Sequence, residues 1–195
     1  VDVVVDPDLA RILRPHQIEG VKFMYEAVTG ISSLEQGHTT PGQGAILADE
    51  MGLGKTLQTI ALIATLLRQN CYFSNIRPGT VEKVLIVCPL TLVVNWKREF
   101  RKWIGRSSIG VLAVEGDGRK EVERFVSHRQ YQVLILGYER LRNCVQELSR
   151  AMPGVGLVVC DEGHRLKSKD TKTTKCFDLL PTRRRILLTG TPIQN

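Results

Sequence analysis

An apolar run, a glycine-containing loop and an amphipathic helix follow one another between residues 45 and 68, and this succession constrains the fold more than any other feature. The loop reads Asp49-Glu50-Met51-Gly52-Leu53-Gly54-Lys55-Thr56. Because Gly52 and Gly54 lack a Cβ, backbone N–H groups can turn toward an anion, and the N-terminus of the helix adds partial positive charge. The segment therefore predicts a strand and a helix joined by a phosphate-binding loop.

The two residues after the glycines indicate which anion is bound. Lys55 can reach the β- and γ-phosphates of a nucleotide, and the Thr56 hydroxyl can ligate Mg²⁺. The pattern G-x-x-x-x-G-K-[ST] is not matched in full, because Asp49 occupies its first glycine position. A glycine-rich turn without a nucleotide is the alternative, but it leaves the Lys-Thr pair unexplained. We expect ATP and Mg²⁺ as cofactors, with nucleotide contacts from Asp49, Met51, Gly52, Leu53, Gly54, Lys55 and Thr56.

Short β-branched runs alternate with amphipathic stretches along the chain, which predicts the α/β class with a mostly parallel sheet and helices on both faces. We expect strands at 45–48, 83–88, 110–114, 132–136, 157–160 and 185–188. We expect helices at 17–28, 54–68, 92–103, 119–128, 139–150 and 171–179, and loops at 30–44 and 70–81. The runs 84–87 and 133–136 are continuously apolar, as in strands that are buried on both faces.

Length and composition limit the classes of protein that remain. A chain of 195 residues is best read as one domain, and 27 Lys and Arg against 20 Asp and Glu give a net charge of +7, which favours a polyanionic partner. The five cysteines include no C-x-x-C pair, so we expect neither a zinc site nor a disulfide framework, and a reducing compartment. No apolar run approaches the length of a membrane span, so we expect a soluble protein without a membrane partner.

A second group of candidate residues follows the apolar run at 157–160, which ends in Asp161 and Glu162. Ligands of doubly wound sheets collect beyond the carboxyl ends of the strands, so both acids should emerge at the edge that holds the loop. Asp161 can hold Mg²⁺ directly or through water, and Glu162 can orient the attacking water. We expect Lys55, Asp161 and Glu162 to be the catalytic residues. The alternative is a pair of solvated acids at a strand end.

Two further segments gain meaning from these groups. The apolar run 185–188 is followed by Thr189, Gly190 and Thr191. We expect these residues to lie beside the γ-phosphate and to couple its presence to the binding of a polymer. The alternative is a turn that simply ends a strand. Gln17 follows Pro15 near a helix start, and its amide could pair with the donor-acceptor edge of adenine. An ordinary surface glutamine is the alternative.

The ordered set of motifs resembles the first RecA-like lobe of the Swi/Snf type of superfamily-two helicase-like ATPases. The loop 49–56 has that family's usual motif I wording, which accounts for the missing glycine, while 161–164 and 187–195 are similar to its motifs II and III. Residues 13–20, 89–103 and 135–142 resemble its adenine-reading segment and its motifs Ia and Ib. The wording looks most like the homologous-recombination DNA repair translocases, in particular their B-type paralogue, although Ser168 stands where these have Asn.

This resemblance implies a nuclear DNA-dependent ATPase that tracks along double-stranded DNA without separating its strands and remodels recombinase filaments or chromatin. Thr91 and Tyr138 occupy motif Ia and Ib positions expected near the DNA backbone. Lys97 and its cationic neighbours on the same helix could add phosphate contacts, although a solvated face is the alternative. Trp96 is expected to pack rather than to stack on a base. A strand-separating DNA or RNA helicase and a non-hydrolysing nucleotide-binding scaffold remain as alternative functions.

The resemblance also implies that residues 1–195 are the helicase ATP-binding domain alone, the first of two RecA-like lobes. The second lobe would act in cis and supply the arginines that stabilise charge on the transferring phosphate. We therefore expect the 195-residue chain to bind ATP weakly and to show little or no DNA-stimulated hydrolysis.

Overall fold

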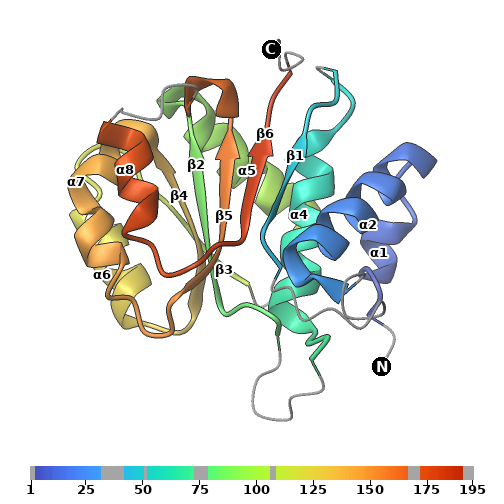
Figure 1. The fold of residues 1–195 in the computed structure, drawn as a ribbon, viewed down its shortest axis with the longest axis horizontal. Helices are drawn as coiled ribbons and strands as arrows, with labels where there is room; N and C mark the ends of the chain where they lie inside the picture. The colour runs from blue at the N-terminus through green and yellow to red at the C-terminus, as the bar shows by residue number, and fades with distance from the viewer. Residues whose placement is uncertain are drawn as a thin grey trace.

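A six-stranded parallel sheet forms the centre of the fold (Figure 1). The computed structural model describes residues 3–31, 42–50, 52–72, 79–105, 109–166 and 172–190. The strand order is β1-β6-β5-β2-β4-β3. The strands are β1 (Gly44–Leu47), β2 (Lys83–Cys88), β3 (Gly110–Ala113), β4 (Tyr131–Gly137), β5 (Val155–Asp161) and β6 (Arg185–Leu188). The predicted α/β class with a parallel sheet is thus confirmed.

Helices cover both faces of the sheet, as predicted (Figure 1). The helices are α1 (Pro7–Ala10), α2 (Pro15–Thr29), α4 (Lys55–Arg68), α5 (Val93–Ile104), α6 (Arg119–Ser127), α7 (Tyr138–Leu148) and α8 (Lys172–Asp178), with short 3₁₀ helices η1 (Leu90–Leu92) and η2 (Gly163–Leu166). Helices α1, α2, α4 and α5 share one hydrophobic core with the sheet, and α6, α7 and α8 share the other. Alternate residues of β2 serve the two cores, because successive side chains of a strand point to opposite faces.

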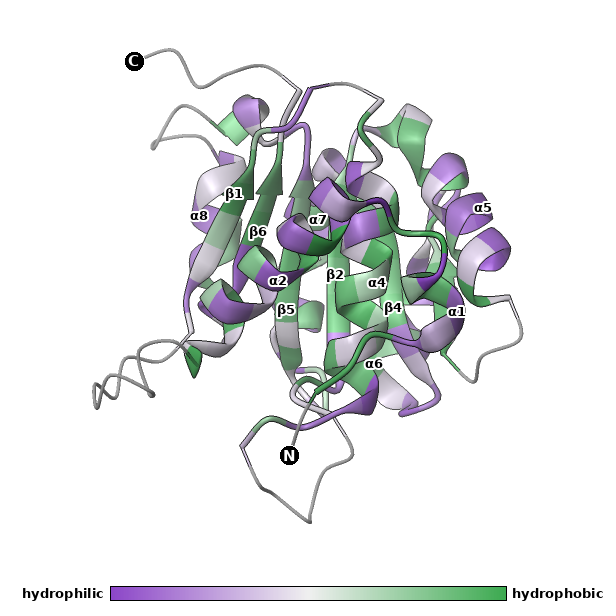
Figure 2. Ribbon diagram, turned by 90° about the vertical axis from the view of Figure 1, so that its right-hand side faces the viewer, coloured by the Kyte–Doolittle hydropathy of each residue, from purple (hydrophilic) through white to green (hydrophobic). Residues whose placement is uncertain are grey.

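The central strand and helix are the most deeply buried elements. All six residues of β2 are buried, which explains why its sequence is apolar without alternation. Residues 57–67 of α4 are all buried as well, because α4 lies between α2, α5 and the sheet. Figure 2 shows hydrophobic residues along the strands and α4, whereas α5 carries hydrophilic residues on its outer side. The packing therefore holds the N-terminus of α4, where Lys55 and Thr56 lie, in a fixed place.

The differences from the predicted elements are small and have local causes. Strand β5 begins at Val155, earlier than predicted, because Gly156 fits inside the strand rather than breaking it; a Cβ there would lie 2.9 Å from the Cβ of Val81. The short helix α1 was not predicted, and Asp6 caps it by accepting a hydrogen bond from the Asp8 N–H at 3.0 Å. Parts of both predicted loops, and the predicted helix start at Thr171, lie outside the described residues.

Two global features of the chain can be read directly. All five cysteines are free thiols, and four of them are buried. Among the described residues, no helix combines the length and the hydropathy that crossing a membrane requires.

Candidate nucleotide and magnesium site

The phosphate-binding loop leaves β1 and enters α4 through two glycines with left-handed backbone conformations. Gly52 has a φ of 88° and Gly54, the N-cap of α4, has a φ of 82°. The backbone conformation of Gly54 favours glycine, and a Cβ there would lie 2.2 Å from the side-chain nitrogen of Gln17 and would displace that amide. Among the residues that the structure describes, no side chain caps the N-terminus of α4, so its first N–H groups remain available to an anion.

Lys55 lies at the centre of this loop. Its ammonium group donates hydrogen bonds to the carbonyl oxygens of Asp49 at 2.5 Å and of Glu50 at 2.9 Å. The lysine cation and the N-terminus of α4 therefore converge on one small region that favours an anion. The nucleotide contacts expected of the loop residues stay a prediction, and Met51 lies outside the described residues.

Gln17 is a buried residue that contacts the loop from α2, not a surface glutamine. Its Oε1 accepts from the N–H of Arg14 at 2.9 Å, and its Nε2 donates to the carbonyl of Leu53 at 3.0 Å. The Nε2 of His16 lies 3.4 Å from the same carbonyl. Each polar atom of the Gln17 amide keeps further hydrogen-bonding capacity, so the predicted contact with adenine stays a prediction.

Gln58 is a second buried amide near the loop, and the sequence analysis missed it. The residue is fully buried in α4, and its Nε2 donates to the carboxylate of Asp49 at 3.3 Å. Asp49 is the residue that replaces the first glycine of the general pattern, so this contact gives the replacement a structural role. The available signal was an amide side chain within a helix that is mostly apolar.

Asp161 ends β5, and its carboxylate is held from two directions. Its Oδ2 accepts from the indole N–H of Trp96 at 2.8 Å, and its Oδ1 accepts from the N–H of Glu162 at 2.9 Å. The hydroxyl of Tyr138 donates to the Asp161 carbonyl at 2.6 Å. Burial raises the pKa of the Asp161 carboxyl, and these N–H donors and the nearby charge of Lys55 partly offset the rise.

Glu162 turns away from the strand line, because its φ of 54° lies in the left-handed region that non-glycine residues seldom adopt. Its carboxylate lies 3.2 Å from the Nδ1 of His164. Such strained conformations persist only where surrounding structure holds them, and they concentrate at functional sites. This geometry is consistent with the catalytic role expected of Glu162.

The donor set at this edge fits magnesium. Thr56 in the first turn of α4 offers a hydroxyl, and Asp161 offers a carboxylate. Mg²⁺ takes one or two carboxylates from the protein and completes its shell with water and phosphate oxygens. In the described part of the chain, no group of three or more His, Cys, Asp or Glu side chains could hold a metal ion. The residues present therefore match a metal that is shared with a nucleotide.

Strand β6 joins the two halves of the site. It lies between β1 and β5, and its last residue, Leu188, is the register partner of both Leu47 and Asp161. The next residue, Thr189, is buried, and its N–H donates to the Leu47 carbonyl at 3.1 Å. Thr189 and Gly190 thus follow a strand that separates the loop from Asp161, whereas Thr191 lies outside the described residues.

The residues predicted to lie near DNA have different environments. Thr91 is exposed in η1, and Lys97 is paired with Glu115 at 2.9 Å, with 41% of its side chain exposed. Tyr138 is half-buried and contacts Asp161 through its hydroxyl, as described above.

Trp96 is 1% exposed and packs near Phe100, with ring centroids 6.3 Å apart, so the prediction that it packs is confirmed. Its bond to Asp161 was not predicted.

Two cavities border the structure at opposite ends of the strands. One, of about 490 Å³, lies beyond β2 and β4; its walls include Pro89, Leu90, Tyr138 and Arg140.

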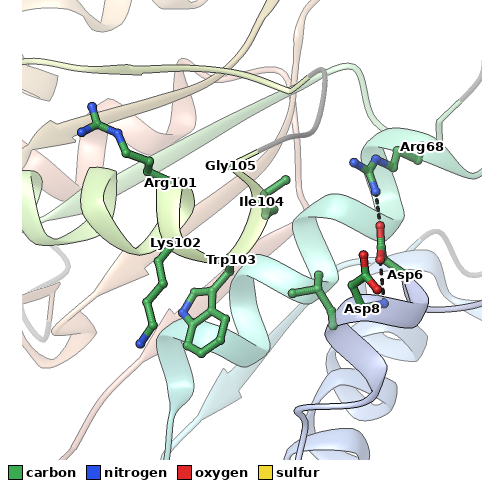
Figure 3. A pocket seen from close by; sticks show the side chains of 9 residues that line it. Asp6, Asp8, Arg68, Arg101, Lys102, Trp103, Ile104 and Gly105 are labelled. Atoms are coloured by element: carbon green, nitrogen blue, oxygen red, sulfur yellow. Dashed lines mark hydrogen bonds and ion pairs between the residues drawn. The ribbon is translucent and has the colours of Figure 1, made fainter.

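The other cavity, of about 500 Å³, lies where α4 and α5 end (Figure 3). There Arg68 pairs with Asp6 at 2.6 Å. The candidate catalytic residues do not line this second cavity, so it is separate from the nucleotide site.

Comparison with known sequences gives a consistent result. The SNF2-related domain, as a family, matches residues 16–195. DNA repair and recombination protein RDH54 of Saccharomyces cerevisiae (strain S288c) is 43% identical over 223 residues, which cover all of this chain and 23% of the yeast protein. DNA repair and recombination protein RAD54B of Gallus gallus is 49% identical over 195 residues, covering all of this chain and 20% of the chicken protein. The chain thus spans less than a quarter of the length of these relatives.

Solved structures agree with this result. The Sulfolobus solfataricus SWI2/SNF2 ATPase core in complex with dsDNA superposes with a TM-score of 0.72 at 29% identity, over all of this chain and 35% of that one. The Sulfolobus solfataricus SWI2/SNF2 ATPase core domain gives a TM-score of 0.64 at 28% identity, over 99% of this chain and 33% of that one. Together these likenesses confirm the RecA-like fold and the resemblance inferred from the motifs.

Proposed function

The chain belongs to the family of SNF2-related domains, and on this premise we propose that it is the ATP-binding lobe of an ATP-dependent double-stranded DNA translocase. One observation carries the proposal. Leu188 of β6 is the register partner of both Asp161 and Leu47, the last residue of β1 before the phosphate-binding loop, so two motifs far apart in sequence lie one strand apart at the carboxyl edge of the sheet. The names of the relatives support a role in recombinational DNA repair.

The loop residues would bind and orient the nucleotide. Lys55 would exchange a loop carbonyl for a phosphate oxygen, and the N–H groups at the start of α4 would bind the same phosphates. Thr56 and Asp161 would hold Mg²⁺. The bound magnesium nucleotide supplies the phosphoanhydride bond and the metal charge that offsets developing negative charge.

Glu162 would orient and polarise the attacking water. Its left-handed backbone directs the side chain away from the strand, and the Nδ1 of His164 lies close enough to restrain the carboxylate. Thr189 and Gly190 would respond to the nucleotide, because they follow the strand between the loop and Asp161. The presence of Lys55, Thr56, Asp161 and Glu162 together argues against a scaffold that never hydrolyses ATP.

Double-stranded DNA is the proposed partner, and the named complex of the Sulfolobus neighbour supports this choice. The net charge of +7 supports a polyanionic partner in general. Thr91, Lys97 and Tyr138 would lie along the DNA path. A nuclear location and an action on recombinase filaments or chromatin are proposed from the repair and recombination names of the relatives.

A second RecA-like lobe would complete the site in cis. The chain spans 35% of the Sulfolobus core and less than a quarter of the eukaryotic relatives, which leaves room for such a lobe in a longer protein. Arginines from that lobe would stabilise the transferring phosphate, a contribution of about 10³–10⁵ in rate for known arginine fingers. The 195-residue chain would therefore bind ATP but hydrolyse it little.

A triplex-displacement assay on the complete protein tests the proposed motor. The protein should remove the third strand in the presence of ATP and leave the underlying duplex paired. Lys55→Ala should abolish displacement, whereas Lys120→Ala on the exposed face of α6 is the matched control and should not. Separation of the duplex would instead favour a helicase, and displacement by the Lys55→Ala variant would contradict the proposal.

A further inference from the structure

Asp161 receives two hydrogen bonds from segments that are not part of the nucleotide loop. The side chain is held by Trp96 of α5 at 2.8 Å, and the main-chain carbonyl by Tyr138, the first residue of α7, at 2.6 Å. Both donors come from elements that follow the carboxyl ends of strands, α5 after β2 and α7 after β4. The expected magnesium ligand is therefore fixed by two neighbouring strand-helix units.

The bond from Trp96 fixes the direction of the carboxylate. Trp96 is 1% exposed, so its indole N–H has no access to water, and losing its acceptor would leave a buried donor unpaired. The other carboxylate oxygen accepts from the N–H of Glu162. With one donor on each oxygen, rotation of the carboxylate breaks at least one bond, while each oxygen keeps a lone pair for a metal.

Tyr138 lines the cavity of about 490 Å³, and Trp96 lies on the helix that follows another part of its wall. Helix α5 continues directly from η1, whose Leu90 is 70% exposed and lines that cavity together with Tyr138. Arg140, on the same wall, donates to the carbonyl of Gly116 at 2.7 Å and is 3.5 Å from Asp117. A ligand that moves η1 or α7 would therefore act on the donors that hold Asp161.

We propose that Trp96 and Tyr138 are positioning residues that hold Asp161 and link binding of the DNA backbone beside η1 and α7 to the magnesium-binding carboxylate. The inference rests on the proposed function, because it assigns to the same site a route by which DNA controls it. Trp96 acts on the carboxylate itself, and Tyr138 acts on the backbone that carries it. A purely structural role would instead make both residues ordinary packing groups.

Magnesium-dependent nucleotide binding by the complete protein is the first test, with a fluorescent ATP analogue as the probe. Trp96→Phe retains an aromatic ring but removes the N–H, so half-maximal binding should need about tenfold more Mg²⁺, the usual cost of losing a partner of a metal ligand. Binding in EDTA should not change. Trp103→Phe is the matched control, because Trp103 also donates to a carboxylate on α5, that of Glu99 at 2.7 Å, away from the site.

A double-mutant cycle shows whether Trp96 acts through Asp161. On an Asp161→Asn background, Trp96→Phe should produce no further shift in the Mg²⁺ requirement, since the carboxylate that it orients is gone. Equal shifts on both backgrounds would overturn the inference. Identical Mg²⁺ requirements for Trp96→Phe and Trp103→Phe would overturn it as well.

The link to DNA is tested in the complete protein with Tyr138→Phe, which removes only a hydroxyl from a half-buried ring. The ratio of duplex-stimulated to basal phosphate release should fall several-fold, and an unchanged ratio would contradict the link. If thermal unfolding shows that Trp96→Phe does not fold, the ratio of duplex-stimulated to basal phosphate release in Tyr138→Phe alone decides whether the inference holds. Failure of the unmutated complete protein to bind nucleotide would refute the proposed function, whereas normal binding with unaffected variants would refute only this inference.

Discussion

At the scale of single residues, the two loop glycines differ in what surrounds them. Both have positive φ values, but a Cβ on Gly54 would meet Gln17 at 2.2 Å, while no atom of the described, non-adjacent residues lies within 4 Å of a Cβ on Gly52. Gly52→Ala should cost only backbone strain, about 1 kcal/mol, and Gly54→Ala should cost about 2–3 kcal/mol because Gln17 must move as well. Urea unfolding of the two variants measures the difference. Equal losses would contradict the close approach of Gln17.

The burial and the hydrogen bonds of Lys83 are visible only in the structure. From the sequence, Lys83 is merely the first residue of an expected strand. It is fully buried, and its ammonium donates to the carbonyls of Phe125, His128 and Tyr131, the last two at 3.0 and 3.1 Å. Burial lowers the pKa of Lys83 from 10.5 to about 8. Lys83 therefore ties the end of α6 to the starts of β2 and β4.

This lowered pKa predicts a pH dependence of stability. Between about pH 8 and 10.5 the unfolded chain holds the Lys83 proton more firmly than the folded chain, so the free energy of unfolding rises with pH across this window. Compared with Lys83→Met, the unmutated chain should gain about 1–3 kcal/mol over the window. Other titrating groups are common to both proteins and cancel in the comparison. Parallel stability curves in urea unfolding would contradict the assignment.

At the scale of elements, Gln17 joins α2 to the phosphate-binding loop, and its effect on stability can be measured separately from its effect on nucleotide binding. Gln17→Ala removes its two hydrogen bonds and should cost about 1–2 kcal/mol of stability. If Gln17 also reads adenine, as we expect, the variant should lose more affinity for ATP than for GTP in nucleotide titrations. Equal losses would mean that Gln17 only supports the loop.

Gln69→Ala is the matched control for this variant. Gln69 bridges the backbone of Val4 through both polar atoms of its amide, as Gln17 bridges Arg14 and Leu53, but it lies just after the other end of α4. The control should lose a similar amount of stability and keep its nucleotide affinity. A parallel loss of affinity would show that the Gln17 effect reports only a weakened α4.

The sequence predicted the elements well, because the strands are continuously apolar and the helices carry clear periodicity. It also placed Lys55 and Asp161 at one edge, since parallel strands share their carboxyl ends. It did not predict the bonds from Trp96 and Tyr138 to Asp161. Those contacts depend on β2 lying between β5 and β4, an order that local patterns do not encode. The start of β5 at Val155 was not predicted either, and the close approach of Gly156 to Val81 joins residues that are distant in sequence.

At the scale of the whole molecule, the candidate chemistry lies at one edge of the sheet. The loop after β1, the turn after β6 and Asp161 of β5 follow three adjacent strands, and the segments expected to face DNA follow β2 and β4 next to them. The segments expected to bind nucleotide and DNA therefore border each other. Under the proposed function, this arrangement would give DNA a short physical route to Asp161, the expected metal ligand.

Phosphate release by the complete protein, measured with and without double-stranded DNA, tests the central claim most directly. We predict low release without DNA, strong stimulation by duplex DNA, and loss of that stimulation in Glu162→Gln but not in the exposed control Glu123→Gln on α6. An equal rate with and without duplex DNA, or full stimulation in the Glu162→Gln variant, would contradict the account.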